Sequence, residues 1–226
     1  MLIFIALILA AVFGPMLWVR WVMQRYATEI PELPGTGGEL AQHLVKKFKL
    51  NGVSVGQTDL GDHYDPEAKQ VNLSAANYSG RSLTAVAVAA HEVGHAIQHQ
   101  QGDKRLAARG RWVVVANKMA RFGAAAMWAA PVLGLLMRHP VPFSALAVVG
   151  LSSLLVRMLV HLFTLPTEFD ASFGKALPIL QEGRYVPVPQ QRVVRRILTA
   201  AALTYVSAAL ADMLNLARWA TLLLRR

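Results

Sequence analysis

Apolar residues in this 226-residue chain gather in long runs that are separated by polar stretches. The runs cover residues 2–19, 122–137, 141–163 and, interrupted by charged residues, 197–224. About 20 apolar residues in a helix cross the hydrocarbon core of a bilayer. The pattern therefore predicts a mainly α membrane protein with about four transmembrane helices.

Residues 28–90 have instead the composition of a soluble domain. Thr36 followed by Glu39 is a capping-box pattern, which predicts the start of a helix after a linker rich in proline and glycine. Short strands are expected near residues 53–55 and 71–74, where apolar side chains alternate with other residues. This region is expected to be small and of α+β type.

The apolar run at residues 82–99 contains no proline, which predicts a helix, and it encloses the sequence HEVGH at 91–95. Residues four apart share one face of a helix, so the imidazoles of His91 and His95 can bind one metal ion. Glu92 lies beside them, where it can take a proton from a water molecule without binding the metal. Because burying such groups without partners is costly, a metal site is preferred to incidental burial.

His99 continues the four-residue spacing, but eight residues separate it from His91. That separation is about 12 Å of helical rise, too far for both rings to reach one ion. A second-shell or surface role is therefore expected for His99. The third ligand must come from another part of the chain.

The stretch LPTEFDAS, at residues 165–172, follows the third apolar run directly. Pro166 and Thr167 are favourable first residues of a helix, which would place Glu168 near the membrane surface beside the HEVGH helix. Glu168 is thus a candidate third ligand. The same position equally suits an acid that is stabilised by a helix dipole, and the residues alone leave both interpretations open.

The net charge of +10 comes from 23 Lys and Arg against 13 Asp and Glu. Since these basic residues flank the apolar runs, they indicate anionic lipid headgroups as partners, not nucleic acid. The segments around HEVGH and after residue 165 are rich in Lys and Arg, whereas the expected hairpin turn has only Arg138. This asymmetry predicts that the site faces the cytoplasm. No cysteine is present, so disulfides and thiolate ligands are excluded.

The expected organisation follows the runs in order. It comprises a retained membrane anchor (1–20), a catalytic region (28–111), a transmembrane hairpin (112–164), a cytoplasmic helix with the candidate ligand (165–196) and a C-terminal transmembrane helix (197–224). Within the spans, Arg157 either pairs with Asp212 or extends its side chain to the interface.

Three stretches carry a resemblance to a known family: DHYDPEAKQVNLS (62–74), NYSGRSLTAVAVAAHEVGHAIQH (77–99) and LPTEFDAS (165–172). In this order, and over nearly the whole chain, they resemble the YugP-like family of membrane neutral zinc metallopeptidases. That family is similar to the HtpX-type membrane proteases, gluzincins whose third zinc ligand is a glutamate on a later helix. The resemblance implies one Zn²⁺ per chain held by His91, His95 and Glu168, in a zincin-like region on the cytoplasmic side of a bacterial inner membrane.

One position departs from the HtpX-type pattern. Those proteases commonly have an aspartate four residues after the ligand glutamate, whereas here that position is Ser172 and Asp170 lies two residues after Glu168. Asp170 is expected to orient a histidine ligand as a second-shell residue.

The resemblance implies a membrane-embedded endopeptidase that hydrolyses polypeptides through a zinc-bound water with Glu92 as general base. Residues 71–74 are expected to form an edge strand that pairs with the substrate backbone. The residues concerned are Val71, Asn72, Leu73 and Ser74.

The reaction also needs a hydrogen-bond donor for the oxyanion, and the sequence does not rank the candidates. These are Tyr78, Tyr185, His63 and His161.

The alternative function is a non-catalytic membrane scaffold, a pseudoprotease that retains the metal site. A metal transporter is disfavoured because the ionisable residues within the spans are mostly cationic. No sequence signal indicates an oligomeric state.

Overall fold

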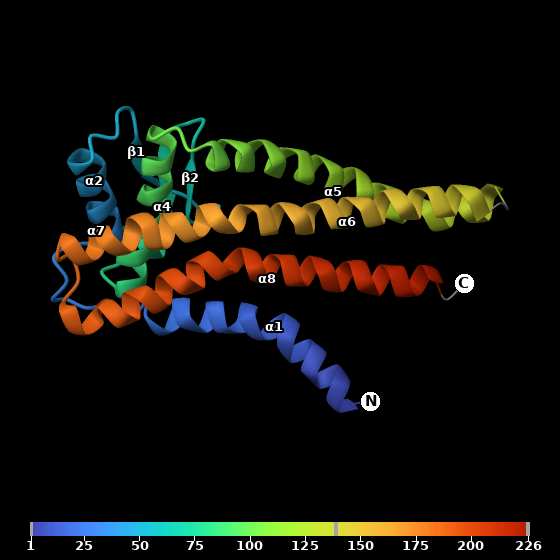
Figure 1. Ribbon diagram of the computed structural model, residues 1–226, viewed down its shortest axis with the longest axis horizontal. Coiled ribbons are helices and arrows are strands. Elements are labelled where there is room, and N and C mark those ends of the chain that lie inside the picture. Colours follow the sequence, from blue (N-terminus) through green and yellow to red (C-terminus); the bar gives the residue numbers. More distant parts are fainter. Residues whose placement is uncertain (1, 138–139, 225–226) are drawn as a thin grey trace. The chain divides into compact units, whose positions relative to one another are not determined.

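A computed structural model describes residues 2–137 and 140–224, which are mainly helical with one three-stranded sheet (Figure 1). The α-helices are α1 (Leu2–Arg25), α2 (Gly37–Lys47), α3 (Ala75–Ser79), α4 (Leu83–Gln100), α5 (Lys104–Met137), α6 (Pro140–Phe169), α7 (Leu177–Glu182) and α8 (Gln191–Leu224). The strands are β1 (Ser54–Gln57), β2 (His63–Asp65) and β3 (Gln70–Leu73). A π-helix, η1 (Asp170–Ala176), and a 3-10 helix, η2 (Val188–Gln190), complete the elements.

The chain forms two compact units. One, the helical unit, consists of the first 16 residues, Ala108–Thr164 and the chain from Tyr205 onward. The other, the mixed unit, consists of Leu17–Ala107 and Leu165–Thr204 and contains the sheet.

Helix α4 is the central element of the mixed unit, and its residues are buried from Leu83 to Gln98. Helix α2 packs on it, burying Leu40 and Leu44, while η1, α7 and the sheet contact other parts of its surface. Figure 1 shows the labels α2, α4, α7, β1 and β2 gathered in one region. A helix enclosed in this way is protected from water along most of its length.

The capping box predicted for α2 is confirmed. The Thr36 hydroxyl accepts from the backbone N–H of Glu39, and the Glu39 carboxylate accepts from the backbone N–H of Thr36 at 2.8 Å. These two bonds satisfy amide donors that have no partner inside the helix. They fix the start of α2 after the linker.

Strand β3 lies at the centre of the sheet, in the order β1-β3-β2. It is parallel to β1 and antiparallel to β2, so hydrogen bonds occupy both of its edges. The expected edge strand at Val71, Asn72, Leu73 and Ser74 is therefore wrong. Val71 and Leu73 are fully buried, and the N–H of Ser74 donates to the Asp62 carboxylate at 2.7 Å.

Helix α6 continues through Pro166, so the prediction of a new helix beginning at that residue is wrong. A proline removes one backbone donor, but a helix tolerates it where the surrounding structure supports the chain. The π-helix η1 follows α6 directly and leads into α7. The final helix also begins earlier than expected, at Gln191.

An ion pair joins α6 and α8 within the helical unit. The Nε atom of Arg157 donates to both carboxylate oxygens of Asp212 at 2.9 Å, and Nε2 of His161 lies 3.4 Å from the same carboxylate. Asp212 is completely buried, whereas the Arg157 side chain is 41% exposed. Pairing, the first of the two roles considered for Arg157, is therefore the one that the structure shows.

Within residues 2–137 and 140–224, two helical stretches are long and apolar enough to cross a membrane, Ala145–Glu182 and Val188–Thr221. About four spans were expected. The turn expected at Arg138 and His139 lies outside the described residues.

Candidate metal centre

Helix α4 positions the histidine pair. Its first turn is capped by Ser82, whose hydroxyl accepts from the N–H of Ala85 at 3.1 Å. Small and apolar residues then let the helix pass through the core, so His91 and His95 are almost completely buried. Their ring centroids lie 4.8 Å apart on one face, as the four-residue spacing requires.

Glu168, near the end of α6, meets both rings with one carboxylate oxygen. Its Oε2 atom lies 3.3 Å from Nε2 of His91 and 3.4 Å from Nε2 of His95. Glu168 is 1% exposed. The candidate ligand atoms of the three residues all lie within 4.8 Å of one another. The structure thus brings the three expected ligands together.

The donor set and its spacing fit zinc. Two imidazole nitrogens and one carboxylate oxygen are the protein ligands of many catalytic zinc sites. Bonds of about 2.1 Å in tetrahedral geometry place ligand atoms about 3.4 Å apart. Both measured distances to Glu168 agree with this value. The donor set and the two distances from Oε2 of Glu168 therefore fit a zinc ion.

The other ring nitrogen of His91 faces Ser172, a fully buried residue of η1, at 3.0 Å. The Ser172 hydroxyl donates its hydrogen to the backbone carbonyl of Leu198 at 3.2 Å. Its oxygen is then an acceptor, and Nδ1 of His91 carries the hydrogen. This tautomer leaves the lone pair of Nε2 directed at the cluster.

The corresponding nitrogen of His95 faces Gln98. Its Nδ1 atom lies 2.9 Å from the side-chain oxygen of Gln98, which is itself 1% exposed. The Gln98 amide nitrogen donates to the carbonyl of Thr167 at 3.0 Å and to the Asp170 carboxylate at 2.8 Å. Asp170 therefore reaches His95 through Gln98.

The π-helix η1 brings Asp170 and Ser172 to α4. An extra residue in a helical turn changes which side chains share a face, and such turns are common at functional sites. Gly94 allows the close approach, because a Cβ atom there would lie 2.8 Å from the carbonyl oxygen of Ala171. The same turn thus serves both histidines.

Comparison with known proteins agrees with this geometry. The model of the family described as "Putative neutral zinc metallopeptidase" matches residues 1–224. The chain belongs to this family. Its resemblance to the YugP-like group is also confirmed, since the Bacillus subtilis (strain 168) protein "Putative membrane protease YugP" is 34% identical over 231 residues. The match covers 99% of this chain and 97% of that relative. No solved structure matches significantly.

Glu92, the candidate general base, follows His91 on α4. It is 7% exposed and so almost as buried as His91 and His95. Its backbone lies within α4, directly after that of His91.

His99 directly follows Gln98 on α4, one turn after His95, and contacts β2. Its Nδ1 atom is 2.8 Å from the Tyr64 hydroxyl, and burial, followed by the charge of Asp65, raises the pKa of Tyr64. Because Tyr64 stays protonated, its hydroxyl can donate to His99. This bond ties β2 to α4 within the mixed unit.

The four candidate oxyanion donors have other partners. The Tyr185 hydroxyl contacts the side chains of His43 and Lys47, and the Tyr78 hydroxyl accepts from Gln42. The His63 ring bonds to the carbonyl of Gly61. His161 belongs to the helical unit, where its ring faces the Asp212 carboxylate.

Sequence reasoning missed Gln98 as a partner of His95. The available signal was its spacing, because residues three apart on a helix are neighbours. The role of Ser172 was also missed, because the HtpX-type pattern has an aspartate at that position and the serine was treated only as a departure from it.

Proposed function

We propose that the chain is a membrane-embedded zinc endopeptidase that hydrolyses peptide bonds in polypeptides. The observation that carries the proposal is the buried cluster of His91, His95 and Glu168, with both histidines oriented by hydrogen bonds to their outer nitrogens. Those three residues would hold the metal. A zinc ion bound by three protein ligands lowers the pKa of water to about 7 and polarises a carbonyl group.

Glu92 performs the proton transfers in this proposal. Its carboxylate accepts a proton from the attacking water and later donates a proton to the leaving amine. The helix holds it next to His91, and its burial shields the transfer from bulk solvent. Substrate alignment is assigned to an outer strand, β1 or β2, because both edges of β3 are occupied.

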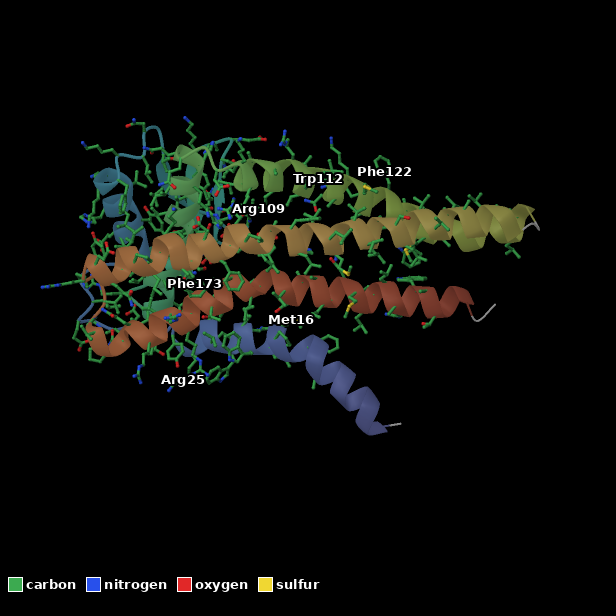
Figure 2. The ribbon with its side chains drawn as sticks, viewed as in Figure 1. Met16, Arg25, Arg109, Trp112, Phe122 and Phe173 are labelled. Carbon is green, nitrogen blue, oxygen red and sulfur yellow. The ribbon has the colours of Figure 1, made fainter. Side chains whose placement is uncertain are left out.

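The membrane location is supported by the two long apolar stretches and by exposed aromatic residues on α5. Trp112 and Phe122, labelled in Figure 2, are 56% and 72% exposed. A bilayer accommodates such side chains, whereas water disfavours them. The relative in Bacillus subtilis is likewise named a membrane protease. The cluster is proposed to lie on the cytoplasmic side, where Lys and Arg concentrate.

Zinc content and proteolysis together test the enzymatic proposal. The full chain, purified in detergent, is compared with Glu92→Gln, Glu168→Ala and the control Glu182→Ala, which changes an exposed glutamate of α7. Elemental analysis should find about one zinc per chain in all but Glu168→Ala. Degradation of unfolded casein should require zinc and should be abolished in Glu92→Gln.

The outcomes separate the alternatives. Full activity of Glu92→Gln would show that another group is the general base. Zinc binding without any proteolysis, in wild type and Glu182→Ala alike, would favour the metal-retaining scaffold. Full zinc occupancy in Glu168→Ala would mean that the third ligand lies elsewhere.

Membrane orientation has a separate test. Because the chain lacks cysteine, Glu182→Cys provides a single reactive thiol in the mixed unit. An impermeant maleimide should label it in permeabilised cells and not in intact ones. Labelling in intact cells would place the site outside the cytoplasm.

A further inference from the structure

Gln98 is a buried polar residue that the proposed chemistry does not use. Its side chain is 1% exposed and belongs to the central helix of the mixed unit. A buried amide is costly unless its donors and its acceptor are all bonded. In this structure three partners surround it: the His95 ring, the Thr167 carbonyl and the Asp170 carboxylate.

The chemistry of these partners determines the orientation of the amide. The Thr167 carbonyl and the Asp170 carboxylate are acceptors only, so the amide nitrogen must face them. The opposite orientation would direct an oxygen at two other oxygens. The amide oxygen therefore faces His95, and the ring nitrogen opposite it must carry a hydrogen. In the neutral ring, which metal binding requires, Nε2 of His95 is then the unprotonated nitrogen at the cluster.

The two acceptors also stand on either side of the third candidate ligand. Thr167 precedes Glu168, and Asp170 follows it by two residues. The amide that orients His95 therefore also holds the backbone from which the Glu168 carboxylate projects. One side chain of α4 links two ligands that come from different helices.

We infer that Gln98 is a positioning residue of the metal centre, which fixes the tautomer of His95 and the placement of Glu168 through Asp170 and Thr167. The inference rests on the proposed zinc-binding function. It assigns to a neutral amide the contact that a carboxylate commonly makes with a metal-binding histidine. The Gln98 side chain separates the Asp170 carboxylate from the His95 ring. Nζ of Lys175 lies 3.8 Å from the same carboxylate.

The first test measures zinc affinity by competition with a fluorescent chelator, using the full chain in detergent. Gln98→Ala should weaken binding about 10- to 100-fold, the usual effect of losing such a partner. The control Gln100→Ala removes an exposed glutamine from the same helix and should leave the affinity unchanged. Wild-type affinity in Gln98→Ala would overturn the inference, whereas a wild type that binds no zinc would overturn the proposed function.

A polarity exchange distinguishes positioning from general stability. Gln98→Glu keeps the acceptor for His95 but directs a second oxygen at Asp170 and Thr167, so zinc binding should weaken. Adding Asp170→Asn supplies an N–H that donates to the introduced carboxylate, and the double variant should regain at least about tenfold in affinity. If the double variant binds no better than Gln98→Glu, the assigned polarity is wrong.

A second readout needs no metal. In ¹⁵N spectra of histidine-labelled, metal-free protein, the His95 resonances, identified with His95→Asn, should show a hydrogen on Nδ1, the nitrogen that faces the Gln98 oxygen. Gln98→Ala should show a mixture of tautomers, and Gln100→Ala should match the wild type. An unchanged His95 tautomer in Gln98→Ala would refute the positioning role, whether or not the wild type binds zinc.

Discussion

Replacing Ser172 by alanine removes one buried oxygen between two helices. In the structure this oxygen lies 3.0 Å from Nδ1 of His91, and its hydrogen is donated to the carbonyl of Leu198 at 3.2 Å, which leaves the oxygen as the acceptor for His91. The substitution leaves the backbone and the Cβ atom in place. Ser172→Ala therefore isolates the hydrogen bonds that orient one ligand.

The expected magnitude follows from what each partner loses. The Leu198 carbonyl lies within α8, where a helical N–H still bonds to it, so its loss is small. The His91 N–H loses its acceptor in a fully buried environment, which costs about 1–3 kcal/mol. Loss of a partner of a metal-binding histidine typically weakens metal binding about 10- to 100-fold, or about 1.4–2.7 kcal/mol. The first figure is the expected loss of folding stability and the second the expected loss of zinc affinity, and each is about 2 kcal/mol.

The assay measures the zinc dissociation constant by chelator competition and compares thermal unfolding with and without excess chelator. Ser153→Ala serves as the control, because Ser153 is a buried serine of the helical unit that donates only locally, to the Gly150 carbonyl at 2.7 Å. Its zinc affinity should equal that of the wild type. Wild-type affinity in Ser172→Ala would refute the claim that this hydroxyl orients His91.

Three further predictions follow from contacts elsewhere in the chain. Thr36→Ala should lower the unfolding free energy by about 1 kcal/mol in thermal unfolding without reducing zinc content, because it removes half of the capping box of α2. Gly94→Ala should lower zinc occupancy, since the added methyl meets the carbonyl of Ala171 at 2.8 Å and separates α4 from η1; normal occupancy would contradict the packing argument. Arg157→Gln should destabilise the protein in detergent more than Asp212→Asn, because it leaves a fully buried carboxylate without its main partner. Equal losses of stability in Arg157→Gln and Asp212→Asn would contradict this expectation.

Local patterns allowed much of this structure to be predicted. The alanine-rich run and its spacing gave α4 and the shared face of His91 and His95, and the Thr36 pattern gave the start of α2. Each of these features depends on residues within about one helical turn of one another. The choice of Glu168 as ligand needed the family resemblance, because the residues alone suited a helix start equally well.

Long-range contacts explain what the sequence did not reveal. The position of β3 between two strands depends on pairing with residues on either side in the chain, which a single alternating pattern does not encode. Pro166 suggested a helix start, but α6 continues through it. The roles of Gln98 and Ser172 depend on partners 72 and 81 residues away.

These separations have a consequence for biosynthesis. The ribosome releases His91 and His95 long before Ser172, which follows His91 by 81 residues, and the carbonyl that fixes Ser172 comes 26 residues later. The intervening chain includes Ala108–Thr164 of the helical unit. A nascent chain therefore carries the HEVGH helix without a complete metal site. The proposed peptidase would therefore stay inactive until the chain as far as Leu198 has been synthesised, and newly made neighbouring proteins would be exposed to its activity only after that point.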